Sequence, residues 1–201
     1  MPSLYDLKPA FQDLLRPLTG LLARAGITPN QVTVAAMALS FAIGGAVVWG
    51  HQTRFVFLLI PLALFLRVAL NATDGMLARE HHMTSKLGAI LNELGDVLSD
   101  MALYLPFAAI PGVSGILVVP VVVLALVSEM TGVLAVLIGA QRRHDGPMGK
   151  SDRAVIFGLL ALMLGLGAQP GRWLDAVLIL MLALLVLTIF NRAHQALKEA
   201  P

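Results

Sequence analysis

Residues 71–100 read NATDGMLAREHHMTSKLGAILNELGDVLSD. This stretch lies between two apolar blocks, yet it carries an Asp-Gly pair, an Ala-Arg pair and several carboxylates. Uncompensated carboxylates in hydrocarbon are costly, so a membrane segment that holds them must turn them toward other protein groups, water or a cation. The stretch therefore indicates a functional site within an otherwise apolar chain.

The composition around this stretch is that of a membrane protein. The chain has 201 residues, of which 58% are hydrophobic and 13% charged, and a soluble fold of this size could not bury so much apolar surface. The apolar residues come in blocks of about 18 to 25, the length that crosses a bilayer as a helix. There is no cysteine, which excludes disulfide and thiolate chemistry.

We expect an all-α integral membrane protein with six transmembrane helices and an N-terminal amphipathic surface helix. Apolar and polar residues alternate at helical spacing over about residues 3–25, which is typical of a helix at the membrane surface. Thr28 is a good N-cap and Pro29 a good first residue for the helix that follows. The expected spans are 30–50, 54–79, 85–110, 113–140, 152–168 and 172–193.

The whole chain, 1–201, is expected to be a single domain, with the surface helix in 1–27 and a six-helix bundle in 28–201. An even number of spans places both termini on one side of the membrane. The positive-inside rule makes that side cytoplasmic, because the basic residues of the termini and of the even-numbered connections outnumber those of the opposite face. The opposite face has Arg54 and Arg172, whereas the cytoplasmic set is Lys8, Arg16, Arg24, Arg79, Lys86, Arg142, Arg143, Lys150, Arg153, Arg192 and Lys198.

Polar residues fall on one face of each of two consecutive predicted helices. Residues three, four or seven apart share a helical face, and two such stripes are expected to face each other. Hard oxygen ligands of this kind favour Mg²⁺, Mn²⁺ or Ca²⁺ over zinc. The stripes are Arg67, Asn71, Asp74 and Ala78 on the first helix and Gly88, Asn92, Asp96 and Asp100 on the second.

The order and spacing of these residues resemble the signature of the CDP-alcohol phosphotransferases, the CDP-alcohol phosphatidyltransferase family. The family pattern is D-x2-D-G-x2-A-R-x8-G-x3-D-x3-D, and every spacing is kept here. The departures are asparagines at the first and third aspartate positions, Asn71 and Asn92. The expected six-span plan, the surface helix and the sequence TPNQVT before the first span also resemble the family, so the resemblance covers nearly the whole chain.

The resemblance implies a role for each motif residue. It implies that Asp74 and Asp96 ligate a cation, Mg²⁺ or Mn²⁺, with Asn71 or Asn92 supplying neutral oxygen, and that Asp96 is the general base. Because two negative charges of the family pattern are missing, one tightly held cation is favoured over two. The residues expected at the nucleotide are Asp74, Gly75, Ala78, Arg79 and Gly88.

Two further groups of charged residues need an explanation. Arg67, Asp100 and Glu129 are expected at similar depth in the membrane, which favours a buried ion-pair cluster; the alternative is a direct catalytic or metal role of Asp100 or Glu129. Lys150 and Arg153 begin a predicted helix after a basic loop, and they fit a site for the lipid or acceptor phosphate. The alternative for these two residues is ordinary positive-inside charge.

The resemblance implies a transferase that moves a phosphatidyl group from a CDP-linked donor, CDP-diacylglycerol, to an alcohol acceptor and releases CMP. A homodimer in the bacterial inner membrane is expected, with membrane lipid and no nucleic acid as partner. The alternative is a catalytically degraded member that acts as a nucleotide-lipid binding or scaffold protein. A transporter or channel is a third hypothesis, but it explains neither the Asp-Gly and Ala-Arg pairs nor their spacing.

Overall fold

The computed structural model describes the backbone of residues 4–200 and the side chains of residues 10–200. Every regular element in these residues is helical. Three short 3₁₀ helices, η1 (Arg54–Leu58), η2 (Leu105–Ala109) and η3 (Ala135–Ile138), adjoin the longer ones. The α-helices are α1 (Leu4–Arg24), α2 (Pro29–Gly50), α3 (Leu59–Glu80), α4 (Lys86–Tyr104), α5 (Gly115–Leu134), α6 (Lys150–Gly165) and α7 (Arg172–Glu199).

Helices occur at all six positions predicted for membrane spans, and four of those described are long and apolar enough to cross a bilayer. These four confirm an integral membrane protein; they are α2, Arg54–Glu80, Gly115–Ile138 and α7. The other two differ for physical reasons: α4 carries the charged residues of the motif, and α6 has only 16 residues. Six spans and the membrane-surface position of α1 therefore stay predictions.

The chain falls into two compact units. Unit 1 comprises Met1–Ala42 and Leu62–Ser99, and unit 2 comprises Ile43–Pro61 and Asp100–Pro201. The unit boundaries fall within helices, so α2, α3 and α4 each have residues in both units. The expectation of a single domain stays a prediction.

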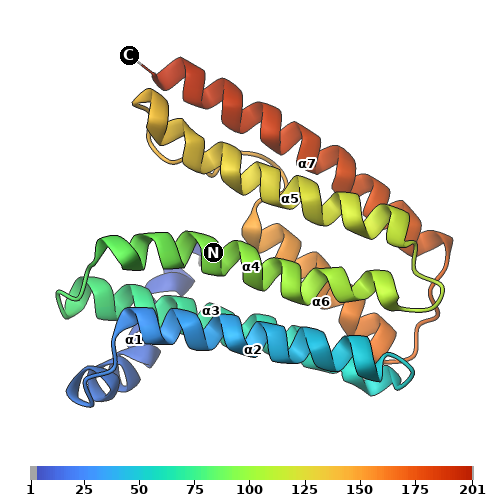
Figure 1. Ribbon diagram of the computed structural model, residues 1–201, viewed down its shortest axis with the longest axis horizontal. Helices are drawn as coiled ribbons and strands as arrows, with labels where there is room; N and C mark the ends of the chain where they lie inside the picture. Colours follow the sequence, from blue (N-terminus) through green and yellow to red (C-terminus); the bar gives the residue numbers. More distant parts are fainter. Residues whose placement is uncertain (1–3, 201) are drawn as a thin grey trace. The chain divides into compact units, whose positions relative to one another are not determined.

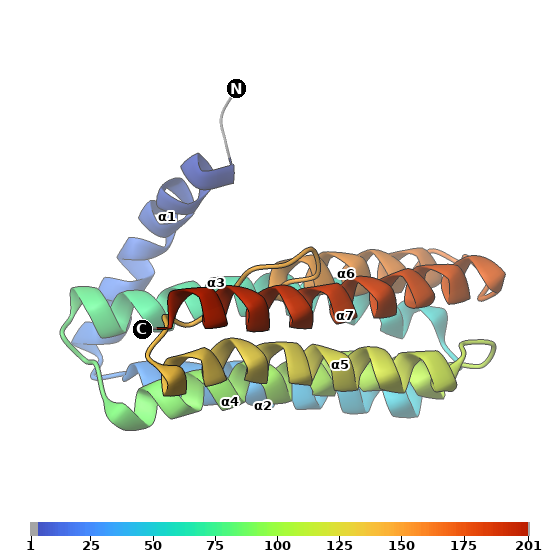
Figure 2. The same ribbon diagram turned by 90° about the horizontal axis from the view of Figure 1, so that it is seen from above.

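Unit 1 brings α2, α3 and α4 side by side, with α1 running across them (Figures 1 and 2). The start of α2 is capped as the sequence predicts. Thr28 Oγ1 accepts a hydrogen bond from the Gln31 amide at 3.3 Å, and Gln31 Oε1 accepts one from the Thr28 amide at 2.9 Å. In the same way, Ser85 Oγ accepts a hydrogen bond from the Gly88 amide at 2.9 Å, which caps α4. These caps fix where the two helices begin.

In unit 2, α5 and α7 pack along each other (Figure 1). The ring of Tyr104 stacks on Phe157 of α6 with 4.1 Å between ring centroids, and Phe107 meets the same ring edge-on at 5.1 Å. Gly165 lets α6 approach η1, because a Cβ at this position would lie 2.5 Å from the side chain of Leu58. Aromatic stacking and close helix contact therefore form the interior of this unit.

Candidate functional site

The predicted base, Asp96, is held by two residues of α3. Asn71 Nδ2 donates a hydrogen bond to Asp96 Oδ1 at 2.9 Å. Arg67 Nη2 lies 3.6 Å from the same oxygen and also donates to the Asp96 backbone carbonyl at 3.3 Å. Because Asp96 belongs to α4, these contacts show that the polar stripes of α3 and α4 face each other within unit 1.

The second motif carboxylate, Asp74, is buried, with only 5% of the residue exposed. Thr33 Oγ1 of α2 donates a hydrogen bond to Asp74 Oδ2 at 2.8 Å, and the same hydroxyl lies 3.1 Å from the Pro29 carbonyl. Sequence reasoning did not assign Thr33 to the site. The signal was present in TPNQVT, but it indicated only where a helix begins.

Glycines bring the helices of the site close together. A Cβ at Gly88 would lie 2.7 Å from Asn30 Oδ1 of α2, and a Cβ at Gly95 would lie 3.2 Å from Thr33 Cγ2. On α3, a Cβ at Gly75 would lie 3.0 Å from Arg79 Nη2, so the guanidinium folds back over this glycine. The motif glycines therefore leave room for particular side chains.

The remaining motif positions lie where the helical spacing predicts. Ala78 and Asn92 are half-buried, and Arg79 is exposed at the end of α3. Asn92 is four residues before Asp96 on α4, so the two share a face. The predicted nucleotide-binding residues of α3 therefore lie together at the C-terminal end of this helix, close to Asp74.

The donor set of these residues fits a hard divalent cation. Asp74 and Asp96 supply carboxylate oxygens, and Asn71, which uses its Nδ2 on Asp96, retains its amide oxygen as a neutral ligand. Among residues 10–200, whose side chains the structure describes, no three His, Asp or Glu side chains lie together so as to hold a metal. Asparagine stands at two of the four motif positions. The motif residues thus offer a divalent cation two carboxylates and neutral amide oxygen.

A buried ionic cluster lies within unit 2. Arg153, whose residue is 1% exposed, has Nη2 2.9 Å from Glu129 Oε1 and 3.3 Å from Asp100 Oδ2. Arg192 Nη1 lies 3.4 Å from the same Glu129 oxygen and donates to the Ser128 carbonyl at 2.6 Å. The guanidinium groups of these arginines neutralise the buried carboxylates, so the cluster is part of the protein interior.

Asp100 and Glu129, two members of the predicted cluster, are buried in the structure. Arg153, predicted as a phosphate ligand, pairs with both carboxylates. Arg192 and Arg142, predicted as part of the cytoplasmic charge, pair with Glu129 at 3.4 and 3.6 Å. The inclusion of Arg67 in the same cluster, and a catalytic role of Asp100 or Glu129, stay predictions.

The basic loop before α6 is tied down at several points. Arg143 makes two hydrogen bonds to Asp145, at 2.7 and 2.9 Å, and one to Glu199 of α7 at 2.7 Å. The Met148 amide donates to Thr188 Oγ1 and the Gly149 amide to Asp152 Oδ2, at 2.9 and 2.8 Å. The loop thus presents Lys150, which is half-buried at the start of α6, from a fixed backbone.

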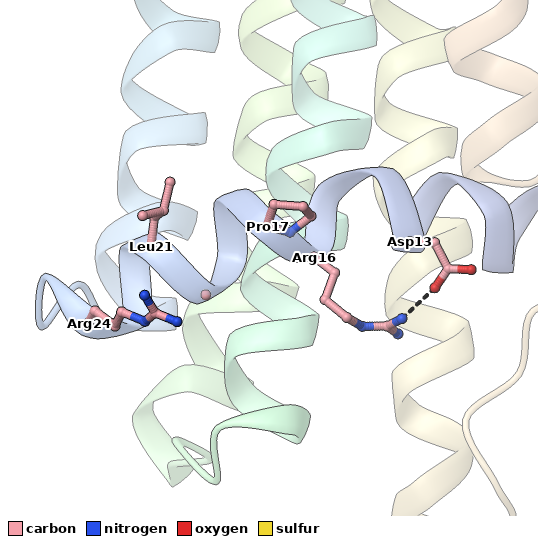
Figure 3. Close-up of a pocket in the computed structure, with 6 residues that line it drawn as sticks. Asp13, Arg16, Pro17, Leu21 and Arg24 are labelled. Atoms are coloured by element: carbon pink, nitrogen blue, oxygen red, sulfur yellow. Dashed lines mark hydrogen bonds and ion pairs between the residues drawn. The ribbon is translucent and has the colours of Figure 1, made fainter.

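An open groove of about 580 Å³ runs along α1 (Figure 3). Its lining combines arginine and apolar side chains, and Arg16 pairs there with Asp13 and, at 3.3 Å, with Glu80 of α3. Exposed leucines continue the apolar side of the helix; Leu14 is 75% exposed. This combination is typical of a helix at a membrane surface and brings no chemistry of its own.

Comparison with known proteins points to one family. The family model described as CDP-alcohol phosphatidyltransferase matches residues 26–191. The chain is 45% identical to the inner membrane protein YnbA of Escherichia coli, over 97% of this chain and 96% of that protein. It is 28% identical to a phosphatidylinositol phosphate synthase of Mycolicibacterium smegmatis, over 96% of this chain and 87% of the enzyme.

The fold is also similar to that of solved structures. The phosphatidylinositol phosphate synthase of Mycobacterium tuberculosis with CDP-DAG bound superposes with a TM-score of 0.76 at 22% identity, over 90% of this chain and 92% of that one. The same enzyme in complex with manganese and citrate gives a TM-score of 0.73 at 22% identity, over 90% and 88% of the two chains.

Proposed function

The chain belongs to the CDP-alcohol phosphatidyltransferase family, and we propose that it transfers a phosphatidyl group from CDP-diacylglycerol to an alcohol and releases CMP. One observation carries this proposal. The two carboxylates that remain in the motif, Asp74 and Asp96, lie on neighbouring helices of one unit, and each accepts a hydrogen bond from a neutral side chain.

The proposal of a CDP-linked donor rests on the motif residues that are predicted to contact the nucleotide. Gly75 and Gly88 carry no side chain, and Ala78 carries only a methyl group. A nucleotide can approach the helix backbones at the two glycines once the side chains that lie over them, Arg79 at Gly75 and Asn30 at Gly88, move aside. Arg79 lies exposed beside them and provides a positive charge for a phosphate. CDP-diacylglycerol is favoured among CDP-linked donors because the structurally similar M. tuberculosis enzyme binds it.

In the proposed reaction, Asp96 takes the proton from the acceptor hydroxyl as general base. The hydroxyl oxygen then bonds to the phosphorus distal to cytidine, and the bond from that phosphorus to the bridging oxygen breaks, so that CMP leaves with the electron pair. Asn71 and Arg67 hold the Asp96 carboxylate in place during proton transfer. A divalent cation at this site would neutralise the charge on the pyrophosphate and the departing CMP.

The cation is proposed to be Mg²⁺ or Mn²⁺, held by Asp74 and Asp96 together with the amide oxygen of Asn71 or Asn92. The similar M. tuberculosis enzyme has been crystallised with manganese. One bound cation is proposed in place of two, since only two carboxylates remain to balance its charge.

For the acceptor, Lys150 is the better candidate of the two predicted phosphate ligands. It is half-buried at the start of α6, whereas the guanidinium of Arg153 is engaged by Asp100 and Glu129. The protein is further proposed to be a homodimer of the bacterial inner membrane with cytoplasmic termini; the E. coli relative is an inner membrane protein.

The experiment is transfer by the purified protein in lipid–detergent micelles. Labelled CDP-diacylglycerol is offered with a panel of alcohols that includes glycerol phosphate, inositol phosphate and serine, and both CMP and labelled lipid are measured. We expect equal release of CMP and formation of one new lipid, loss of both with EDTA, and recovery with Mg²⁺ or Mn²⁺. Full activity of the metal-stripped protein would contradict the mechanism.

A second candidate is favoured by the two asparagines, which leave the motif with half of its family's aspartates. In this alternative the protein binds the CDP-lipid without turning it over. Binding of labelled CDP-diacylglycerol without CMP release, together with an unchanged lipid mass spectrum on overexpression, would support the alternative and overturn the transferase.

A further inference from the structure

Thr33 of α2 contacts both motif helices of unit 1. Its hydroxyl donates to Asp74 Oδ2 of α3 at 2.8 Å. Its methyl group lies against α4 at Gly95, where an added Cβ would come within 3.2 Å of Thr33 Cγ2. Gly95 directly precedes Asp96, so one side chain touches a cation-ligand residue on one helix and the backbone next to the other.

The Thr33 hydroxyl bonds more strongly to Asp74 than to the Pro29 carbonyl of its own helix. A threonine hydroxyl has one proton and a choice of acceptors, here the Asp74 carboxylate at 2.8 Å and the Pro29 carbonyl at 3.1 Å. The charged acceptor is both nearer and intrinsically stronger. Asp74 is buried, so its oxygen is fixed by such donors and not by bulk water.

The methyl contact limits how closely α4 can approach. Gly95 is buried and carries no side chain, and a Cβ there would lie 3.2 Å from Thr33 Cγ2, which is closer than an ordinary van der Waals contact. Because protein interiors are close-packed, removing the methyl group or adding one at Gly95 shifts the helix beside it.

From these contacts we propose that Thr33 is a positioning residue: its hydroxyl orients the Asp74 carboxylate, and its methyl group sets the distance of α4, so that Asp74 and Asp96 are spaced for one cation. The inference rests on the proposed function in so far as these two aspartates ligate the metal. Groups that orient metal ligands typically change metal affinity by about 10- to 100-fold when removed.

The test separates the hydroxyl from the methyl group and uses Mn²⁺ binding, followed by EPR of the free ion, as its readout. Thr33→Val keeps the shape and loses the hydroxyl, so we expect Mn²⁺ affinity to fall about tenfold or more. Thr33→Ser keeps the hydroxyl and loses only the methyl contact with Gly95, so its affinity should fall less than that of Thr33→Val. The matched control is Thr73→Val, since the buried Thr73 hydroxyl donates to the Ala69 carbonyl of its own helix and, among the described residues, to no other group.

A second pair of variants tests the spacing. Gly95→Ala presses a methyl group on Thr33 and should weaken Mn²⁺ binding, whereas Gly95→Ala with Thr33→Ser removes the opposing methyl group and should recover it. The melting temperature of every variant is measured alongside, so that a general loss of folding is distinguished from a loss confined to the metal.

Three results would overturn the inference: Mn²⁺ affinity of Thr33→Val equal to that of Thr73→Val, equal losses in Thr33→Val and Thr33→Ser, or no recovery in the Gly95→Ala double variant. A wild type that binds no Mn²⁺ would overturn it as well. A wild type that binds Mn²⁺ but transfers no phosphatidyl group would contradict the proposed function alone, because the Mn²⁺ affinities of the variants still decide the role of Thr33.

Discussion

Asn71 donates its amide proton to the carboxylate of Asp96 across 2.9 Å. An aspartate at position 71, as the family pattern has, cannot donate this hydrogen bond while it is ionised. Two carboxylates would then lie at the same distance and would need a cation between them. The asparagine thus gives the site an internal contact that holds without metal, which is a physical reason to regard it as an adaptation.

Asp96→Asn should reduce phosphatidyl transfer to less than roughly a tenth, a loss of more than about 1.4 kcal/mol in transition-state stabilisation. The change removes the proposed base and one of two motif carboxylates, while an amide can still accept the hydrogen bond from Asn71. CMP release measures the effect, and the melting temperature should stay close to that of the wild type. Asp175→Asn, the same chemical change on α7, serves as the control; an active Asp96→Asn would remove Asp96 from the role of base.

Replacing Arg153 and replacing Lys150 should have different effects, the first on stability and the second on acceptor binding. Arg153→Met leaves two buried carboxylates, Asp100 and Glu129, without this arginine and should lower the free energy of unfolding by about 3–5 kcal/mol. Lys150→Met should lower the melting temperature less than Arg153→Met does and should raise the KM for a phosphorylated acceptor. If Arg153→Met were fully stable and raised the same KM, the phosphate role would belong to Arg153 instead.

Arg143, which bonds to Asp145 and Glu199, should stabilise the loop before α6 to a degree that depends on pH. Hydrogen bonding to Arg143 lowers the pKa of Asp145 below its ordinary value, which is about 3.9. The stabilisation from this pair is therefore complete above about pH 4 and disappears as the pH falls through the lowered pKa. We expect Arg143→Ala to melt below the wild type at pH 7, with the difference shrinking at pH 3. Lys198→Ala is the control, and a difference independent of pH would contradict the assigned cause.

The helices and their starts were predictable from the sequence because they depend on local chemistry. Thr28 and Gln31 are three residues apart, and their reciprocal hydrogen bonds follow from that spacing alone. The facing of α3 and α4 was predictable for a similar reason. Helical periodicity places Asn71 and Asp96 on the polar side of each helix, and polar sides avoid lipid.

The partners of buried charges were not predictable, because they depend on contacts between distant parts of the chain. Arg153 reaches back 53 residues to Asp100, although its place at a helix start favoured a phosphate role. Thr33 was missed because a threonine on an apolar helix has the same pattern whether its hydroxyl bonds its own helix or a carboxylate on another. Only packing distinguishes the two.

Asn71→Asp and Asn92→Asp should have unequal effects, although both restore the family pattern. Asn71→Asp replaces a hydrogen bond to Asp96 with repulsion and should cost about 1–3 kcal/mol without metal, or roughly 2–4 °C in melting temperature for each kcal/mol. In the part of the chain that the structure describes, Asn92 makes no side-chain hydrogen bond, so its change should cost less. Added Mg²⁺ should restore the stability of both.

The double variant decides whether the asparagines are adaptation or decay. Two added charges should permit a second cation to bind, measured as Mn²⁺ stoichiometry by EPR, with turnover on the natural acceptor unchanged or lower and more dependent on metal concentration. This follows because the surroundings of the site, including the Arg67 guanidinium 3.6 Å from Asp96, are fitted to fewer carboxylates. Wild type and double variant are compared across one Mg²⁺ titration. An inactive wild type beside an active double variant would mean that the asparagines had inactivated the enzyme, and the transferase proposal would then hold only for the restored motif.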